Sequence, residues 1–242
     1  MSEAGQLERL VDSLVSRIGF TRLRLWKDVL FHPTATFEQE MGKASLSRGA
    51  IDVFIALLAF TFILAGLIVL VYTGLLLVLS ELVAFAATGQ FNVVQFLLTL
   101  VELAVVGIAA SAIASIVFSA LGVVSWLVLT GIEFVLARLL GGTGAFTPHA
   151  YLYAITLAAY YVFSLPLFIL LLLPCIGIVF EIIALFFYIY ILYLWYKAVR
   201  IVHGLGKWPA IVVVLLPIVL MILAVVAIYA FLIASLIVLR AS

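Results

Sequence analysis

A glycine-rich stretch, "LLGGTGAFTPHAY" from Leu139 to Tyr151, has residue types that could hold a phosphate group. A Walker-type loop needs Gly-x4-Gly-Lys followed by Ser or Thr, because its lysine contacts the terminal phosphates. This stretch has no lysine, and an apolar helix precedes it where a dinucleotide-binding fold has a strand. A turn between two helices is therefore favoured over a ligand-binding loop, and it would be formed by Gly141, Gly142, Gly144, Thr147 and Pro148.

The order of residues in this turn predicts how one helix ends and the next begins. Gly141 and Gly142 are expected to adopt the left-handed conformations that close a helix. Thr147 would cap the second helix with its side chain. Pro148 would take the first helical position, where a missing N–H costs nothing.

Glu133 is an acid inside an apolar segment, where a charge costs about 2.5–3.5 kcal/mol even on lenient insertion scales. Three cations are expected at a similar depth: Arg138, Lys197 and Arg200. We predict that Glu133 turns inward and pairs with one of them, Arg200 being the first choice. The alternatives are that Glu133 takes part in a proton or solute relay, or that its side chain extends to the membrane surface.

The remaining reactive side chains do not form a recognisable catalytic or metal site. His32, His149 and His203 stand alone, without the His-Glu-x2-His spacing of a zinc helix. The single Cys175 excludes a multi-cysteine metal site. No serine lies in a Gly-x-Ser-x-Gly context, and no histidine is expected at mid-bilayer depth to act as its base. We predict a protein that is not an enzyme and binds no cofactor or metal.

The composition indicates the class of protein that must position these residues. Hydrophobic residues make up 68% of the 242-residue chain and charged residues 10%, against roughly a quarter charged in a soluble domain. The uncharged runs 53–80, 103–132 and 208–239 each exceed the roughly 20 residues that cross a bilayer. The fold class is therefore an all-α integral membrane protein. The net charge of +1 gives no reason to expect nucleic acid as a partner.

Hydropathy and helix-breaking residues predict five transmembrane helices, at about 50–80, 107–140, 148–173, 176–196 and 208–239. Residues 93–106 are predicted to form a short interfacial or re-entrant helix. Residues 1–49 would form a cytoplasmic amphipathic region in front of a five-span domain, 50–242.

The second predicted span carries small residues at four-residue spacing: Gly107, Ser111, Ser115 and Ser119. Such a stripe lets another helix approach closely, and close approach is how helices associate in lipid. We expect helix packing along it.

The N-terminal region is expected to contact the membrane. Its apolar residues recur at helical spacing, with charged residues opposite, and the predicted contacts are Leu7, Leu10, Leu14 and Ile18. Trp26, flanked by basic residues, suits the depth of the lipid headgroups.

The distribution of Lys and Arg predicts the orientation. Five spans place eleven of the 12 basic residues on one side and only Arg240 on the other. Because basic residues are enriched on the cytoplasmic side, we expect the N-terminus in the cytoplasm and the C-terminus outside.

The order of four stretches resembles the Yip family of membrane proteins. They are "LFHPTATFEQEMGKASLSRGAI", "LLGGTGAF", "AYYVFSLPLFI" and "YLWYKAVRIVHGLGKWPAIVVVLLP". The resemblance implies five spans and a cytoplasmic N-terminus. Eukaryotic relatives act in vesicle traffic, binding Rab-type GTPases and each other. The chain lacks the Asp-Leu-x-Gly-Pro signature of that branch and is more similar to the prokaryotic branch. A prokaryotic plasma membrane is thus expected, and small-GTPase binding is not.

These observations lead to two functional hypotheses. The first is a non-enzymatic scaffold that organises or shapes the lipid bilayer, alone, as a homo-oligomer or with other membrane proteins. The second is a small-solute or lipid permease, with a polar midplane cavity built from Glu133, the serine stripe and a helix break at Pro166.

Overall fold

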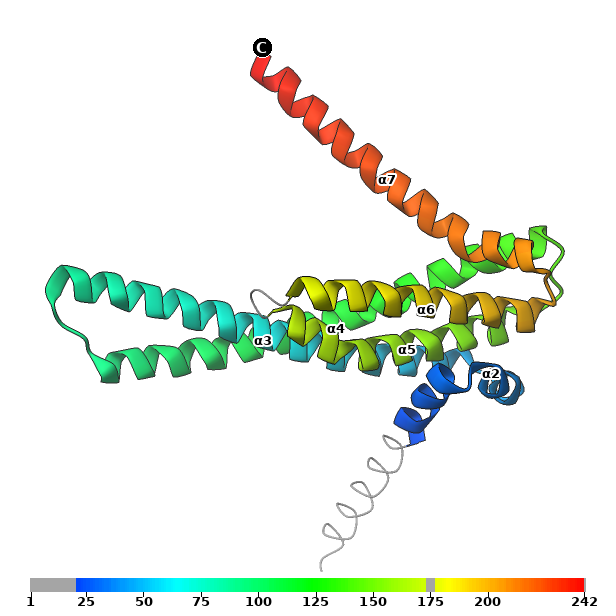
Figure 1. Cartoon of the computed structure of the whole chain (residues 1–242), viewed down its shortest axis with the longest axis horizontal. Coiled ribbons are helices and arrows are strands. Elements are labelled where there is room, and N and C mark those ends of the chain that lie inside the picture. Colours follow the sequence, from blue (N-terminus) through cyan, green and yellow to red (C-terminus); the bar gives the residue numbers. More distant parts are fainter. Residues whose placement is uncertain (1–20, 173–176, 242) are drawn as a thin grey trace, which may run out of the picture.

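The computed structural model describes residues 21–172 and 177–241, and the helices connected by short turns in these ranges confirm the all-α fold class. Residues 21–31 are helical. The other helices are α2 (Pro33–Met41), α3 (Leu46–Thr88), α4 (Val93–Leu139), α5 (Phe146–Leu171), α6 (Gly177–His203) and α7 (Lys207–Ala241) (Figure 1).

Helices α3 to α7 are all long and apolar enough to cross a membrane. They correspond in number and order to the five predicted spans, but the bounds differ. Residues 93–106 are not a separate interfacial or re-entrant helix, because they form the first part of α4. The Asn92 side chain accepts a hydrogen bond from the Gln95 N–H at 3.0 Å and so starts the helix there. No proline follows within α4 to end it, and Gly107 is accommodated inside the helix.

Helices α3 and α4 form a hairpin that packs closely along the predicted stripe of small residues. Gly107, Ser111, Ser115 and Ser119 are all buried. A Cβ on Gly107 would lie 2.3 Å from Val69 Cγ1 in α3, so the missing side chain sets how near the two helices come.

The α3–α4 hairpin is much longer than the α5–α6 hairpin beside it (Figure 1). The rings of Phe60 in α3 and Phe168 in α5 lie 5.2 Å apart, which aligns the two parallel helices. Beyond this contact α5 continues only to Leu171, whereas α3 continues to Thr88. At 1.5 Å per residue, the additional 25 residues of α3 extend about 37 Å further.

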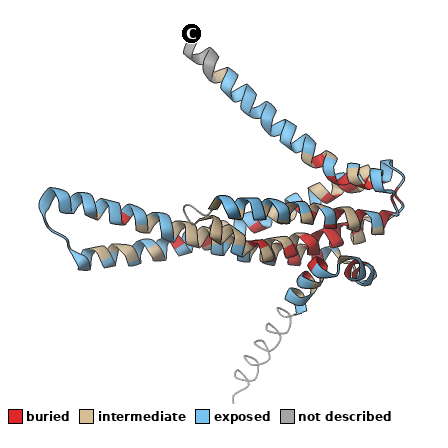
Figure 2. Cartoon of the chain, in the orientation of Figure 1, coloured by how far each residue is buried: buried red, intermediate tan, exposed pale blue. Residues whose placement is uncertain are grey.

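Helix α7 leaves the bundle soon after it begins. Ala210, Val213 and Val214 are buried near its start. The described side chains from Val219 to Ile233 are exposed, and most of the helix is pale blue in Figure 2. The far parts of α7 and of the α3–α4 hairpin are thus long apolar surfaces that other described protein elements do not cover.

The segment 21–31 and α2 pack against the bundle. Trp26, Val29 and Leu30 are buried, and the Tyr190 hydroxyl of α6 donates to the Leu30 carbonyl at 2.5 Å. Trp26 is only 3% exposed, so the predicted contact of this ring with lipid headgroups is wrong: the ring faces the protein core. Leu7, Leu10, Leu14 and Ile18 lie outside the described residues, and their membrane contact stays a prediction.

Candidate functional site

A buried chain of polar side chains joins α4, α5 and α6 near one end of the bundle. The Tyr153 hydroxyl donates to Glu133 Oε1 at 3.2 Å. Glu133 Oε2 lies 3.8 Å from His149 Nε2. His149 Nδ1 in turn lies 3.2 Å from His203 Nε2, and one of these two nitrogens donates to the other. We call Glu133, Tyr153, His149 and His203 the polar network.

The polar network is closed off by aromatic rings. Tyr153 stacks on Trp195 with ring centroids 4.2 Å apart, and Phe134 contacts the rings of both histidines. Glu133 is 0% exposed, and the other three members are also buried. The arrangement can hold three helices in register, but the 3.8 Å between Glu133 Oε2 and His149 Nε2 is too long for a hydrogen bond, and among the described residues neither atom has another hydrogen-bond partner. Within the described part of the chain the Glu133 side chain has no exposed surface.

Glu133 does not pair with the predicted cations. Arg200 donates to the Leu205 carbonyl at 3.4 Å and to the Tyr196 hydroxyl at 3.2 Å. The Lys197 ammonium donates to the Thr34 hydroxyl, and Arg138 donates to the Gly142 carbonyl. The prediction was wrong because the phenol and imidazole groups of α5 lie nearer to Glu133 than any guanidinium or ammonium group.

The glycine-rich turn between α4 and α5 holds the end of α6 in place. The Thr143 N–H donates to the His203 carbonyl at 3.2 Å. A Cβ on Gly142 would lie 2.9 Å from His203 Cβ, and one on Gly144 would lie 2.4 Å from the Val202 carbonyl oxygen. Contact with α6 therefore explains Gly144, and contact with both α6 and the Ala137 carbonyl oxygen of α4 explains Gly142, whereas Gly141 is needed for its backbone, with φ of 91°.

Three details of the predicted turn are corrected. Of Gly141 and Gly142, only Gly141 has a positive φ and therefore a left-handed conformation. The N-cap of α5 is Ala145, with no side-chain cap, so Thr147 does not cap the helix. Helix α5 begins at Phe146, which places Pro148 third rather than first.

A second polar cluster attaches the N-terminal segments to the bundle. Glu40 of α2 accepts from the Tyr151 hydroxyl of α5 at 2.9 Å and pairs with Lys43 and Arg48. Arg22 and Asp52 pair nearby at 2.5 Å. These contacts were not predicted from the sequence, and neither were His149 and Tyr153 as partners of Glu133. The four-residue spacing of His149 and Tyr153 puts them on one face of α5, which was the available signal.

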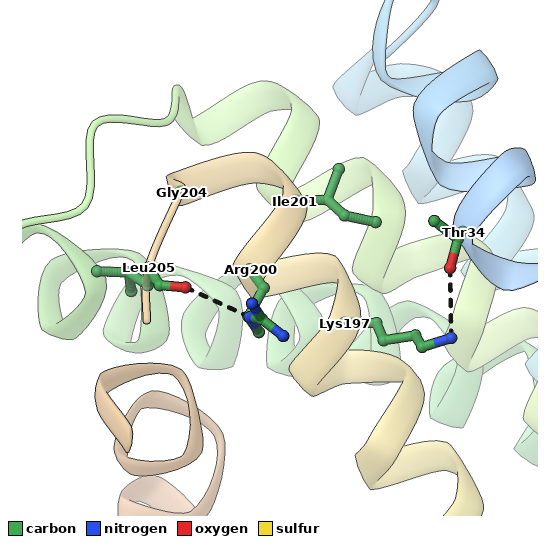
Figure 3. Close-up of a pocket in the computed structure, with 6 residues that line it drawn as sticks. All are labelled: Thr34, Lys197, Arg200, Ile201, Gly204 and Leu205. Carbon is green, nitrogen blue, oxygen red and sulfur yellow. Dashed lines mark hydrogen bonds between the residues drawn. The ribbon is translucent and has the colours of Figure 1, made fainter. Parts of the chain in front are cut away.

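A cationic pocket lies between α2, α6 and the connection from α6 to α7 (Figure 3). Its volume is about 340 Å³, and its lining residues are Thr34, Lys197, Arg200, Ile201, Gly204 and Leu205. In residues 21–172 and 177–241 no group of three or more His, Cys, Asp or Glu side chains is placed to hold a metal ion.

The family model of the Yip1 domain matches residues 27–228. The chain belongs to the Yip1 family. The matched range runs from the segment before α2 into α7, so the polar network and the cationic pocket both lie inside the Yip1 domain. No curated protein and no solved structure matches the chain.

Proposed function

We propose that this Yip1-domain chain is a non-enzymatic scaffold that shapes the bilayer, alone or with other copies or membrane proteins. The observation that carries the proposal is the unequal length of its two hairpins. We place its N-terminus in the cytoplasm, on the Lys and Arg distribution described above, and its membrane-contacting N-terminal residues in the same leaflet.

The shorter hairpin fits a bilayer and the longer one does not. Helices α5 and α6 have 26 and 27 residues, about 40 Å each, close to the 40–45 Å of a whole bilayer. Helices α3 and α4 have 43 and 47 residues, about 64 and 70 Å, which is roughly one and a half times the same 40–45 Å.

The excess length is mainly apolar, apart from Glu81 and Glu102, and the described protein elements leave most of it uncovered. At the tip of the α3–α4 hairpin the large exposed side chains include Leu82, Val83, Phe85, Val94 and Leu98. Water is a poor solvent for such a surface. A hydrophobic helix that is longer than the bilayer is thick tilts or bends, or it thickens the lipid around it. Local thickening is the response that changes membrane shape, and it is the one on which the proposal rests.

The transport alternative receives less support. It needs Glu133 at a polar cavity, but this side chain is 0% exposed and packed among aromatic rings. A neighbouring cavity of about 420 Å³ is lined by Tyr153 and other mainly aromatic and apolar residues. Of the second-span serines only Ser125 lines it, and Glu133, Ser111, Ser115 and Ser119 do not.

The proposal is tested by reconstituting the full chain into vesicles and imaging them by electron cryomicroscopy. We expect local thickening or increased curvature that depends on protein density. A variant without residues 82–88 and 93–99 shortens each arm by about 10 Å, retains the turn 89–92, and should deform vesicles less. Its helix content and monodispersity serve as controls for folding. Equal deformation by both proteins, or none by the full chain, would overturn the proposal.

A further inference from the structure

The cationic pocket contains two positive charges with no negative partner. In the described part of the chain no carboxylate lies within 4 Å of Lys197 or Arg200. Other basic residues that approach acids, such as Arg22 and Arg48, do form ion pairs. The charge of the pocket is therefore available to a ligand.

Neutral groups hold both cations in place and leave donors unused. Lys197 Nζ donates to Thr34 Oγ1 at 3.3 Å and lies 4.9 Å from the centre of the Tyr193 ring. Arg200 bonds the Leu205 carbonyl and lies over the Tyr196 ring. An ammonium has three N–H donors and a guanidinium five, so several remain for an anion that enters the pocket. Both residues line the pocket, and Figure 3 shows the Lys197 side chain extending to Thr34 of α2 and the Arg200 side chain to Leu205 in the α6–α7 connection.

The surroundings of the pocket suit the depth of lipid headgroups. Tyr193 is half exposed on α6, and Trp208, at the start of α7, is 78% exposed. Exposed Tyr and Trp rings beside basic residues are typical of the membrane–water interface. The apolar residues Ile189 and Leu185 are exposed further along α6, where acyl chains would run.

We propose that the cationic pocket binds the phosphate of an anionic phospholipid, with the acyl chains lying along α6. Charge-assisted hydrogen bonds from Lys197 and Arg200 to phosphate oxygens give the affinity, and a lipid is favoured over free phosphate because the pocket adjoins a membrane-facing surface. Because Thr34 belongs to α2 and the cations to α6, the bound headgroup also bridges these helices. This inference does not depend on the proposed membrane shaping.

Native mass spectrometry of the full chain tests the proposal. The protein in neutral detergent is titrated with phosphatidylglycerol, with phosphatidylcholine, or with soluble glycerol phosphate. We expect phosphatidylglycerol to bind at least about tenfold more tightly than phosphatidylcholine, consistent with ordinary values for charged hydrogen bonds. Equal retention of the two lipids would overturn the proposal, and so would equally tight binding of glycerol phosphate, which would make a soluble phosphate the ligand.

Variants locate the site. Lys197→Gln/Arg200→Gln should lose the preference for phosphatidylglycerol. Lys27→Gln/Lys207→Gln removes the same charge from exposed positions outside the pocket and should retain most of it. If the double pocket variant does not fold, Lys197→Gln alone is used, whose side chain is held only by Thr34 and Tyr193. Unchanged lipid preference in a folded pocket variant, or equal loss in the control pair, would place the binding elsewhere.

Discussion

Replacing Gly144 by alanine should separate the α4–α5 turn from the end of α6. The added Cβ would lie 2.4 Å from the Val202 carbonyl oxygen and 2.6 Å from Val202 Cγ1. Real Cβ atoms almost never approach other heavy atoms closer than 3.0 Å. The side-chain methyl can rotate away, but the carbonyl belongs to the α6 backbone and cannot. The turn must therefore shift relative to α6.

We expect this variant to lose about 1–3 kcal/mol of unfolding free energy, the usual cost of overpacking a tight contact. The shift also strains the His149–His203 contact, because His203 directly follows Val202. Unfolding in mixed micelles with increasing SDS, followed by tryptophan fluorescence, measures the loss.

Two matched variants separate backbone contact from other effects of a glycine substitution. Gly131→Ala places its Cβ in open space within α4, so it should leave stability unchanged or raise it by up to about 1 kcal/mol through helix propensity. Gly107→Ala meets a side-chain atom, Val69 Cγ1, at 2.3 Å, and should cost less than Gly144→Ala because that methyl can move. If Gly144→Ala were as stable as Gly131→Ala, the proposed close contact of turn and α6 would be refuted.

Three further predictions concern the polar contacts and the N-terminus. Glu133→Leu should cost about 1–3 kcal/mol of unfolding free energy, because it leaves the Tyr153 hydroxyl without its acceptor. Adding Tyr153→Phe should recover part of this loss. If the losses of the two substitutions were additive in SDS unfolding, the hydrogen bond between Tyr153 and Glu133 would be refuted. Tyr151→Phe should speed proteolysis of α2 by removing the bond to Glu40, whereas cleavage at the parental rate would show that this bond does not hold α2. Deletion of residues 1–20 should preserve the fold but weaken the binding of the detergent-solubilised protein to vesicle surfaces. Unchanged cosedimentation with vesicles would refute the predicted membrane contact of Leu7 to Ile18.

The sequence predicts the helices better than their contacts. Uncharged runs suffice to identify the spans because burial in lipid requires little more than apolar length. A helix starting at residue 93 was predicted, but its continuation into the second span was missed: Asn92 caps the helix at its start, and Gly107 is accommodated inside it. The local sequence pattern thus predicts the type and approximate length of a helix, whereas the residues at which the helix begins and ends depend on contacts with neighbouring residues.

The partner of Glu133 could not be predicted because it depends on how the α4–α5 turn folds. That turn brings His149 and Tyr153 of α5 against α4, and it also contacts His203 of α6. His149 and Tyr153 are nearer to Glu133 in sequence than Arg200 is, but sequence distance does not show which side chains face the carboxylate. Trp26 was misjudged for a related reason, since its basic neighbours suggested a lipid surface while its ring packs into the core.

The depth of the α3–α4 tip tests the central claim most directly. Spin labels at Val94, near the tip, and at Phe168, near the end of α5, are compared for accessibility to oxygen and to a water-soluble nickel complex after reconstitution. We predict that both labels are exposed to oxygen and shielded from nickel, because lipid must follow the hairpin about 37 Å beyond α5. A Val94 label open to the nickel complex, with Phe168 shielded, would mean that the tip stands in water and that the bilayer is not deformed to cover it.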